Sequence, residues 1–129
     1  MSDTARVLNS GPGCPELKIV EGEGDARAVA WPGVGSKLRS MARIKLKAGA
    51  ASVRLAHEME AVYYIIAGNG VVEDPDIGDS QALIAGAMVH IEPGTAYRFV
   101  PDQDGMELIG GPCPPDPALY RDFMTGSTG

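Results

Sequence analysis

Glycine and proline interrupt this chain at short intervals, and their spacing limits the folds available to it. The 129 residues include 17 glycines and 10 prolines. The segments between them are brief and rich in Val, Ile, Leu and Tyr, which favour strands. The expected strands cover residues 17–20, 27–30, 40–47, 52–57, 61–67, 70–74, 80–84, 88–91, 96–100 and 106–110. The pattern predicts an all-β sandwich or barrel, in which residues 117–124 are the one segment that could form a short helix.

Residues 61–67 are expected to form the central strand. Every residue of their sequence, AVYYIIA, is aliphatic or aromatic, so the side chains on both faces of the strand are expected to be buried. Gly68, Asn69 and Gly70 follow directly and predict a tight hairpin into the next strand. A second turn is predicted at residues 92–94, because proline fixes φ and glycine accepts positive φ.

Length and charge exclude several classes of protein. A chain of 129 residues fits one domain, over residues 1–129, that buries roughly two thirds of its unfolded surface. The net charge of −6 argues against nucleic acid as a partner. No apolar run is long enough to span a membrane, so we expect a cytoplasmic protein without a membrane partner. Cys14 and Cys113 show no metal-binding or redox spacing and are expected to be ordinary thiols.

Two segments carry a more specific pattern. Residues 48–70, AGAASVRLAHEMEAVYYIIAGNG, run from a glycine turn through a histidine-bearing strand to an aliphatic strand that ends in Gly-x-Gly. Residues 86–101, GAMVHIEPGTAYRFVP, place a Pro-Gly turn between two short strands. These segments resemble the two characteristic motifs of the cupin family. The resemblance implies a cupin double-stranded β-helix, which is a jelly-roll β-barrel.

The resemblance also implies where metal ligands would lie. Three histidines and a glutamate usually occupy the positions that hold Leu55, His57, Ala61 and Tyr97 here. Only His57 is a usual ligand, and one imidazole cannot hold a divalent metal ion on its own. We therefore expect no metal or other cofactor.

A shifted metal site is the alternative. His57, Glu60 and His90 would together supply two histidines and one carboxylate, the minimum for an iron site of that type. A shift of one residue along a strand turns the side chain to the opposite face unless a bulge intervenes. A divalent metal is therefore disfavoured.

The same pocket could perform acid–base chemistry without a metal. His57 is the expected base, Glu60 the orienting group or second acid, and Tyr97 a proton or hydrogen-bond donor. These roles suit an isomerase, cyclase or lyase that acts on a small oxygenated metabolite. The expected ligand-binding residues are Tyr63, Leu55, Arg43, His90 and Phe99.

The sequence leaves three functions open. The first is a metal-independent enzyme, the second a non-catalytic module that binds a small-molecule ligand, and the third a metal-dependent enzyme of oxygenase type with an atypical ligand set. Whether the chain is an enzyme is not decided at this stage. A homodimer is expected, because cupins of this size commonly pair and exposed sheet edges need covering.

Overall fold

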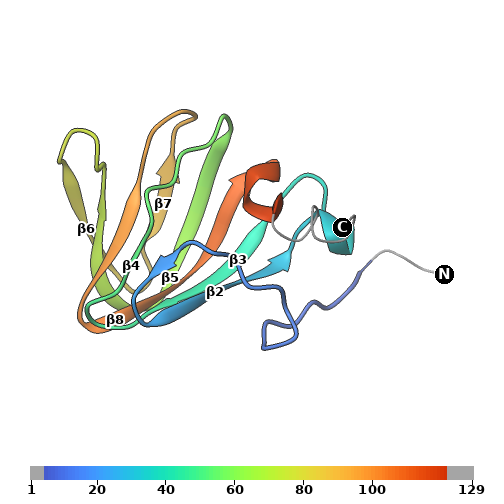
Figure 1. Ribbon diagram of the computed structural model, residues 1–129, viewed down its shortest axis with the longest axis horizontal. Helices are drawn as coiled ribbons and strands as arrows, with labels where there is room; N and C mark the ends of the chain where they lie inside the picture. Colours follow the sequence, from blue (N-terminus) through green and yellow to red (C-terminus); the bar gives the residue numbers. More distant parts are fainter. Residues whose placement is uncertain (1–4, 122–129) are drawn as a thin grey trace.

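A computed structural model describes residues 5–121 of the chain, and within that range it contains eight β-strands and two short 3₁₀ helices (Figure 1). The strands are β1 (Val20–Glu21), β2 (Gly24–Ala30), β3 (Met41–Leu46), β4 (Ala51–Ser52), β5 (Glu60–Glu73), β6 (Ser80–Ile84), β7 (Met88–Ile91) and β8 (Arg98–Cys113). The helices are η1 (Pro32–Val34) and η2 (Pro117–Tyr120). Neither helix approaches the length and apolar character that crossing a membrane requires.

The strands form two antiparallel sheets, so the expected all-β jelly roll is confirmed. β1 and β4 pair with each other, and the larger sheet has the order β2-β3-β8-β5-β6, with β7 also paired to β5. The expected closed barrel is not observed. β6 pairs with one half of β5 and β7 with the other half, so the described strands leave the structure open between β6 and β7.

The hairpin expected at Gly68–Asn69–Gly70 is absent, because β5 continues through these residues. The pairing of β5 with β8 shifts register on both sides of Gly68, which bends the strand without ending it. Gly68 has φ +81°, and a Cβ atom there would lie 2.2 Å from the carbonyl oxygen of Gly105. Gly68 therefore allows β5 and β8 to approach closely at this point. The pairing of these two strands prevails over the local sequence preference for a turn.

The expectation that residues 61–67 are buried on both faces is also wrong. Ala61, Tyr63 and Ile65 point inward and are buried. On the opposite face the side chains of Tyr64 and Ile66 are 43% and 40% exposed. No described element covers that side of the sheet, so this strand presents an apolar outer face.

Several other boundaries differ from the sequence-based expectation. Residues 96–100 and 106–110 belong largely to one long strand, β8, which bends at Gly105 with φ +79°. Of residues 52–57, only Ser52 lies in a strand, and Leu55 forms an isolated bridge with Tyr97.

The turn predicted at residues 92–94 is observed, whereas the helix predicted at residues 117–124 is shorter than expected. The turn at residues 92–94 is confirmed, since Thr95 N–H donates to the carbonyl oxygen of Glu92 and Gly94 has φ +83°. The expected helix at residues 117–124 is a short 3₁₀ turn over Pro117–Tyr120, and residues 122–124 lie outside the described range.

Candidate functional site

Four polar side chains form a continuous network in the interior. The Nε2 atom of His57 lies 2.6 Å from the hydroxyl of Tyr97, which lies 2.6 Å from the hydroxyl of Tyr63. The Nδ1 atom of His57 lies 2.6 Å from a carboxylate oxygen of Asp116. His57, Tyr63 and Tyr97 are buried and Asp116 is partly buried. These polar side chains can lie in the interior because each of them has a hydrogen-bond partner.

Four separate parts of the chain supply these side chains. Tyr63 lies on the inner face of β5, and Tyr97 immediately precedes β8. His57 lies in the loop before β5, where its carbonyl oxygen accepts from Gly94 N–H at 2.7 Å. Asp116 begins η2 and its second carboxylate oxygen accepts from Ala118 N–H at 3.0 Å. The last interaction is an N-cap, which fixes the carboxylate that faces His57.

The donor and acceptor inventory gives the network one direction when His57 is neutral. An ionised Asp116 only accepts, so the Nδ1 atom of His57 carries the proton. Nε2 is then an acceptor, and the Tyr97 hydroxyl donates to it. The Tyr63 hydroxyl donates in turn to the oxygen of Tyr97. The proton order therefore runs from Tyr63 through Tyr97 and His57 to Asp116.

Burial keeps the two tyrosines in their protonated form. It is the main cause that raises the pKa of Tyr97 above its ordinary value, and the neighbouring Tyr63 adds to that rise. Burial also raises the pKa of Tyr63, and the hydrogen bond with Tyr97 partly offsets this effect. Both phenols therefore act as neutral hydrogen-bonding groups near pH 7.

Apolar residues seal the network. Phe99 is fully buried, and its ring centre lies 4.8 Å from that of Tyr63 and 5.6 Å from that of Tyr97. Leu55 is buried and pairs with Tyr97 through its backbone in both directions. Leu55 and Phe99 thus hold the tyrosine in place, and neither lines the cavity described next.

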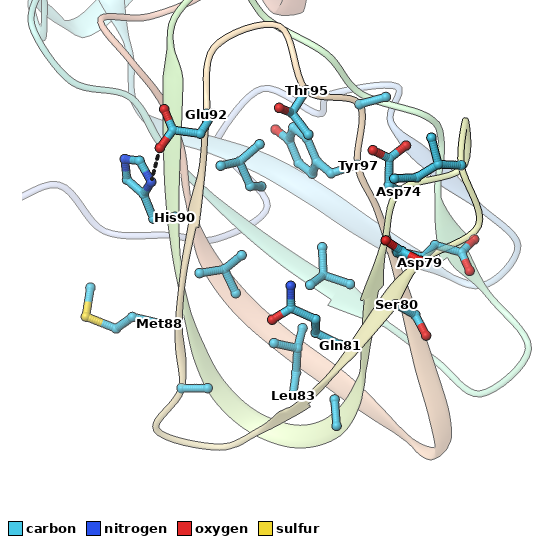
Figure 2. A pocket seen from close by; sticks show the side chains of 18 residues that line it. Asp74, Asp79, Ser80, Gln81, Leu83, Met88, His90, Glu92, Thr95 and Tyr97 are labelled. Atoms are coloured by element: carbon cyan, nitrogen blue, oxygen red, sulfur yellow. Dashed lines mark ion pairs between the residues drawn. The ribbon is translucent and has the colours of Figure 1, made fainter.

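A cavity of about 430 Å³ lies beside this network, between β6 and β7. Figure 2 shows Gln81 and Leu83 of β6 directed into it, with the Tyr97 ring at its wall. Its apolar walls come mainly from Val72, Leu83, Val89 and Ile91. Tyr97 is the one member of the four-residue network that lines the cavity, while His57, Tyr63 and Asp116 lie behind it. Tyr97 therefore connects the cavity to the buried histidine.

Glu60 and His90 lie outside this site. The Nε2 atom of His90 contacts a Glu60 carboxylate oxygen at 2.6 Å, and both side chains are half-exposed on the outer face of the sheet. The hydrogen bond that the His90 ring donates to the Glu60 carboxylate is the main cause that raises the pKa of His90. The structure therefore does not bring Glu60 or His90 together with His57, as strand alternation requires when no bulge reverses the faces.

Arg43 also lies on the outer face. Its guanidinium forms an ion pair with Glu107 and donates to the hydroxyl of Ser10 at 2.8 Å. The inward-facing neighbours Ala42 and Ile44 are buried. Arg43 is thus separated from the cavity by the strand that carries it.

The described residues do not fit the metal ion that the fold family commonly implies. Leu55 and Ala61 lie buried at positions that would need nitrogen or oxygen ligands, burial keeps the Tyr97 phenol protonated, and His57 already has partners on both ring nitrogens. Among residues 5–121 no group of three or more His, Cys, Asp or Glu side chains gathers to hold a metal ion. The alternative set of His57, Glu60 and His90 is not assembled.

Asp116 and the cavity walls were not found from the sequence. Asp116 follows a proline-rich segment, CPPDP, which gave no sign that it returns to a histidine 59 positions earlier. Its place before Pro117 is a recognisable N-cap signal, but a cap reveals nothing about long-range partners. Gln81 and Leu83 lie on a strand that was predicted correctly, although its position beside a cavity depends on the curvature of β5.

Comparison with solved structures identifies the fold. The sequence matches no protein-family model and no curated protein. The structure resembles an RmlC-like cupin from Shewanella frigidimarina, with TM-score 0.65, 21% identity and coverage of 85% of this chain and 92% of that one. It also resembles the polyketide cyclase RemF from Streptomyces resistomycificus, with TM-score 0.69, 16% identity and coverage of 89% and 82%. For the ectoine synthase from P. lautus the TM-score is 0.63, the identity 18% and the coverage 84% and 75%. The protein has the cupin fold.

Removal of the Tyr97 hydroxyl should destabilise the protein measurably. Tyr97→Phe leaves the Nε2 atom of His57 and the hydroxyl of Tyr63 without their shared partner, which we expect to cost about 1–3 kcal/mol. Tyr64→Phe is the matched control, because its side chain lies on the half-exposed outer face and a surface change costs about 0.5 kcal/mol or less. Urea denaturation measures both. Equal stabilities of the two variants would contradict the network.

Proposed function

We propose that this cupin-fold protein binds a small molecule in the cavity between β6 and β7. The observation that carries the proposal is the cavity itself, whose wall includes Tyr97, the outermost member of a buried polar network. A volume of about 430 Å³ falls within the range typical of ligand sites, roughly 300–1,000 Å³. The fold supports the proposal because β6 and β7, which form walls of the cavity, both pair with the long strand β5.

The composition of the cavity wall supports recognition of a mainly apolar molecule. Leu83, Val89 and Ile91 are buried residues that contribute apolar surface. Gln81 and Thr95 add an amide and a hydroxyl at separate points of the wall. A few polar groups on an apolar surface is the composition that orients small ligands. A ligand that carries oxygen atoms on an apolar body matches this wall.

A variant that fills the cavity should lose the ligand. Gln81→Trp places a large side chain into the cavity from an exposed position on β6, so the core need not be repacked. Purified protein is incubated with a metabolite extract from the cells that express it, and bound molecules are identified by native mass spectrometry. We expect the native sequence to retain a small molecule and Gln81→Trp to lose it.

Gln103→Trp is the control for that experiment, since it adds the same side chain at an exposed position of β8 away from the cavity. It should retain the molecule. Failure of the native sequence to bind anything, or retention by Gln81→Trp, would reject the cavity as the binding site.

Acid–base catalysis is a second candidate function, and the His57–Asp116 contact favours it. A proton taken from a ligand at the Tyr97 oxygen can be balanced by transfer of the Tyr97 proton to the Nε2 atom of His57. The imidazolium that results is stabilised by Asp116, 2.6 Å from Nδ1. Reversal of these transfers at a different ligand atom completes an isomerisation. Asp116 takes the orienting role expected of Glu60, which supports the metal-independent alternative.

Hydrogen exchange into the ligand tests this chemistry. The small molecule that the native protein retains from the metabolite extract is incubated with it in deuterated water, and deuterium at carbon is measured by mass spectrometry. We expect exchange by the native protein, and a loss of about 100-fold or more in Tyr97→Phe and in His57→Gln, with the ligand still bound. Tyr64→Phe should exchange normally. Binding without any exchange in the native protein would leave the non-catalytic function.

We also propose that the chain forms a homodimer through the outer face of β5 and β7. Tyr64, Ile66 and Met88 expose 43%, 40% and 68% of their surface there. Tyr64 and Met88 are directly paired across β5 and β7, so their side chains lie side by side on this face. A twofold axis near Tyr64 would bury this apolar face of one copy against the same face of the other, which favours a second copy of the chain as the partner.

The mass of the protein in solution tests the dimer. Met88→Glu places a charge on the outer face and should convert a dimer into a monomer, because a buried unpaired charge is costly. Leu38→Glu is the control, since Leu38 is 80% exposed and lies before β3, away from β5 and β7. Light scattering after gel filtration should give a dimer for the native sequence and Leu38→Glu. A native monomer would contradict the proposal.

A further inference from the structure

We infer that the cavity selects by charge, and that its ligand carries a protonated amine on an apolar body rather than a carboxylate or phosphate. This inference rests on the proposed binding function and specifies the class of ligand. It is argued from where the charged side chains of the described residues lie around the cavity.

The ionisable groups along the cavity are predominantly acidic. Glu73, Asp74, Asp79 and Glu92 line it, and no lysine or arginine among the described residues does so. Glu73 is paired with Arg98, and the Glu92 carboxylate faces His90, so Asp74 and Asp79 are the two lining carboxylates without an ion-pair partner within residues 5–121. Arg54 is hydrogen-bonded to Asp76 in the same loop and also interacts electrostatically with Asp74, so the negative charge of the two aspartates is offset only in part.

The loop between β5 and β6 holds these two aspartates together. Asp74 N–H donates to the carbonyl oxygen of Asp79 at 2.8 Å, and Gly78 N–H donates to the carbonyl oxygen of Asp74 at 2.8 Å. The two residues therefore face each other across the base of a closed loop. Asp74 is partly buried and Asp79 is exposed, so one carboxylate lies nearer the interior than the other.

The arginines that could have offered an anion site are already paired with carboxylates. Arg54 makes two hydrogen bonds to Asp76, at 2.9 and 2.8 Å, and the bonded guanidinium lowers the pKa of that carboxyl group. Arg98 contacts Glu73 at 3.0 Å and also donates to the backbone carbonyl of Ser52. Arg43 lies on the outer face with Glu107, as described above.

The one basic residue along the cavity points away from it. His90 lies on β7, and Figure 2 shows its side chain and that of Met88 on the far side of the strand from Gln81 and Leu83. His90 is occupied by Glu60 at 2.6 Å, and its other ring nitrogen lies 3.6 Å from Glu92. Protonation of His90 would therefore be matched on the outer face, and would not supply an anion site in the cavity.

Three indole compounds with the same ring system and nearly equal side chains test the charge preference. Tryptamine carries a protonated amine, tryptophol a hydroxyl and indole-3-acetate a carboxylate. Each is titrated at low salt into isotope-labelled protein, and NMR shifts of the Leu83, Val89 and Ile91 methyl groups report binding in the cavity. We expect tryptamine to bind roughly three- to tenfold more tightly than tryptophol, and indole-3-acetate to bind most weakly.

Neutralising the two carboxylates should remove the preference. The double variant Asp74→Asn with Asp79→Asn should bring tryptamine to the affinity of tryptophol, while tryptophol itself binds as before. Glu23→Gln removes a carboxylate from an exposed position outside the cavity and should leave the order unchanged. A rise in salt should narrow the same difference, because exposed charges are screened.

The outcomes separate this inference from the binding function. Shifts of the three methyl groups with equal affinities, or with indole-3-acetate bound most tightly, would overturn the charge preference and leave binding in the cavity intact. A preference that survives in the double variant would also overturn it. If none of the three compounds shifts the cavity methyl groups, the cavity is not a binding site and both proposals fail.

Discussion

The hydrogen bond between His57 and the Tyr97 hydroxyl is the contact on which the interior of this protein depends. Both groups are buried, and an unpaired polar group there would cost about 1–3 kcal/mol. The bond ties the loop before β5 to the start of β8, and Asp116 ties the C-terminal segment to the same ring. Tyr63 completes the set from the centre of the sheet. One cluster thus joins four distant parts of the chain where related folds commonly hold a metal ion.

Tyr97 is the side chain that links the cavity to the buried polar network. The histidine, the aspartate and one tyrosine are enclosed, while Tyr97 alone of the four also forms part of the cavity wall. In the proposed function these parts have separate roles: the cavity wall would select the ligand by shape and charge, and burial in the network would keep the Tyr97 phenol neutral. A neutral phenol beside a histidine–carboxylate pair can donate or relay a proton without a metal ion.

The success of the sequence interpretation differs between features for physical reasons. Tyr63 is buried on the inner face of β5, as its strand parity with Ala61 indicated, and the cupin resemblance indicated the position of Tyr97. Strand alternation also raised the objection to Glu60, which the structure places on the outer face. The hairpin at Gly68 was predicted wrongly, since the same glycine that permits a turn also permits the close approach of β8. Asp116 lay beyond local rules, because its contact with His57 depends on the path of the last segment.

The sequence by itself determined the all-β architecture, the turn at residues 92–94 and the identity of the residues that replace metal ligands. These features follow from backbone preferences and from the order of residues along short segments. Only the tertiary structure decided that the sheets stay open between β6 and β7, that Arg43, Arg54 and Arg98 are each paired with a carboxylate and that Asp116 meets His57. Strand curvature and contacts between distant segments set these outcomes, and neither is encoded in the local periodicity of the chain.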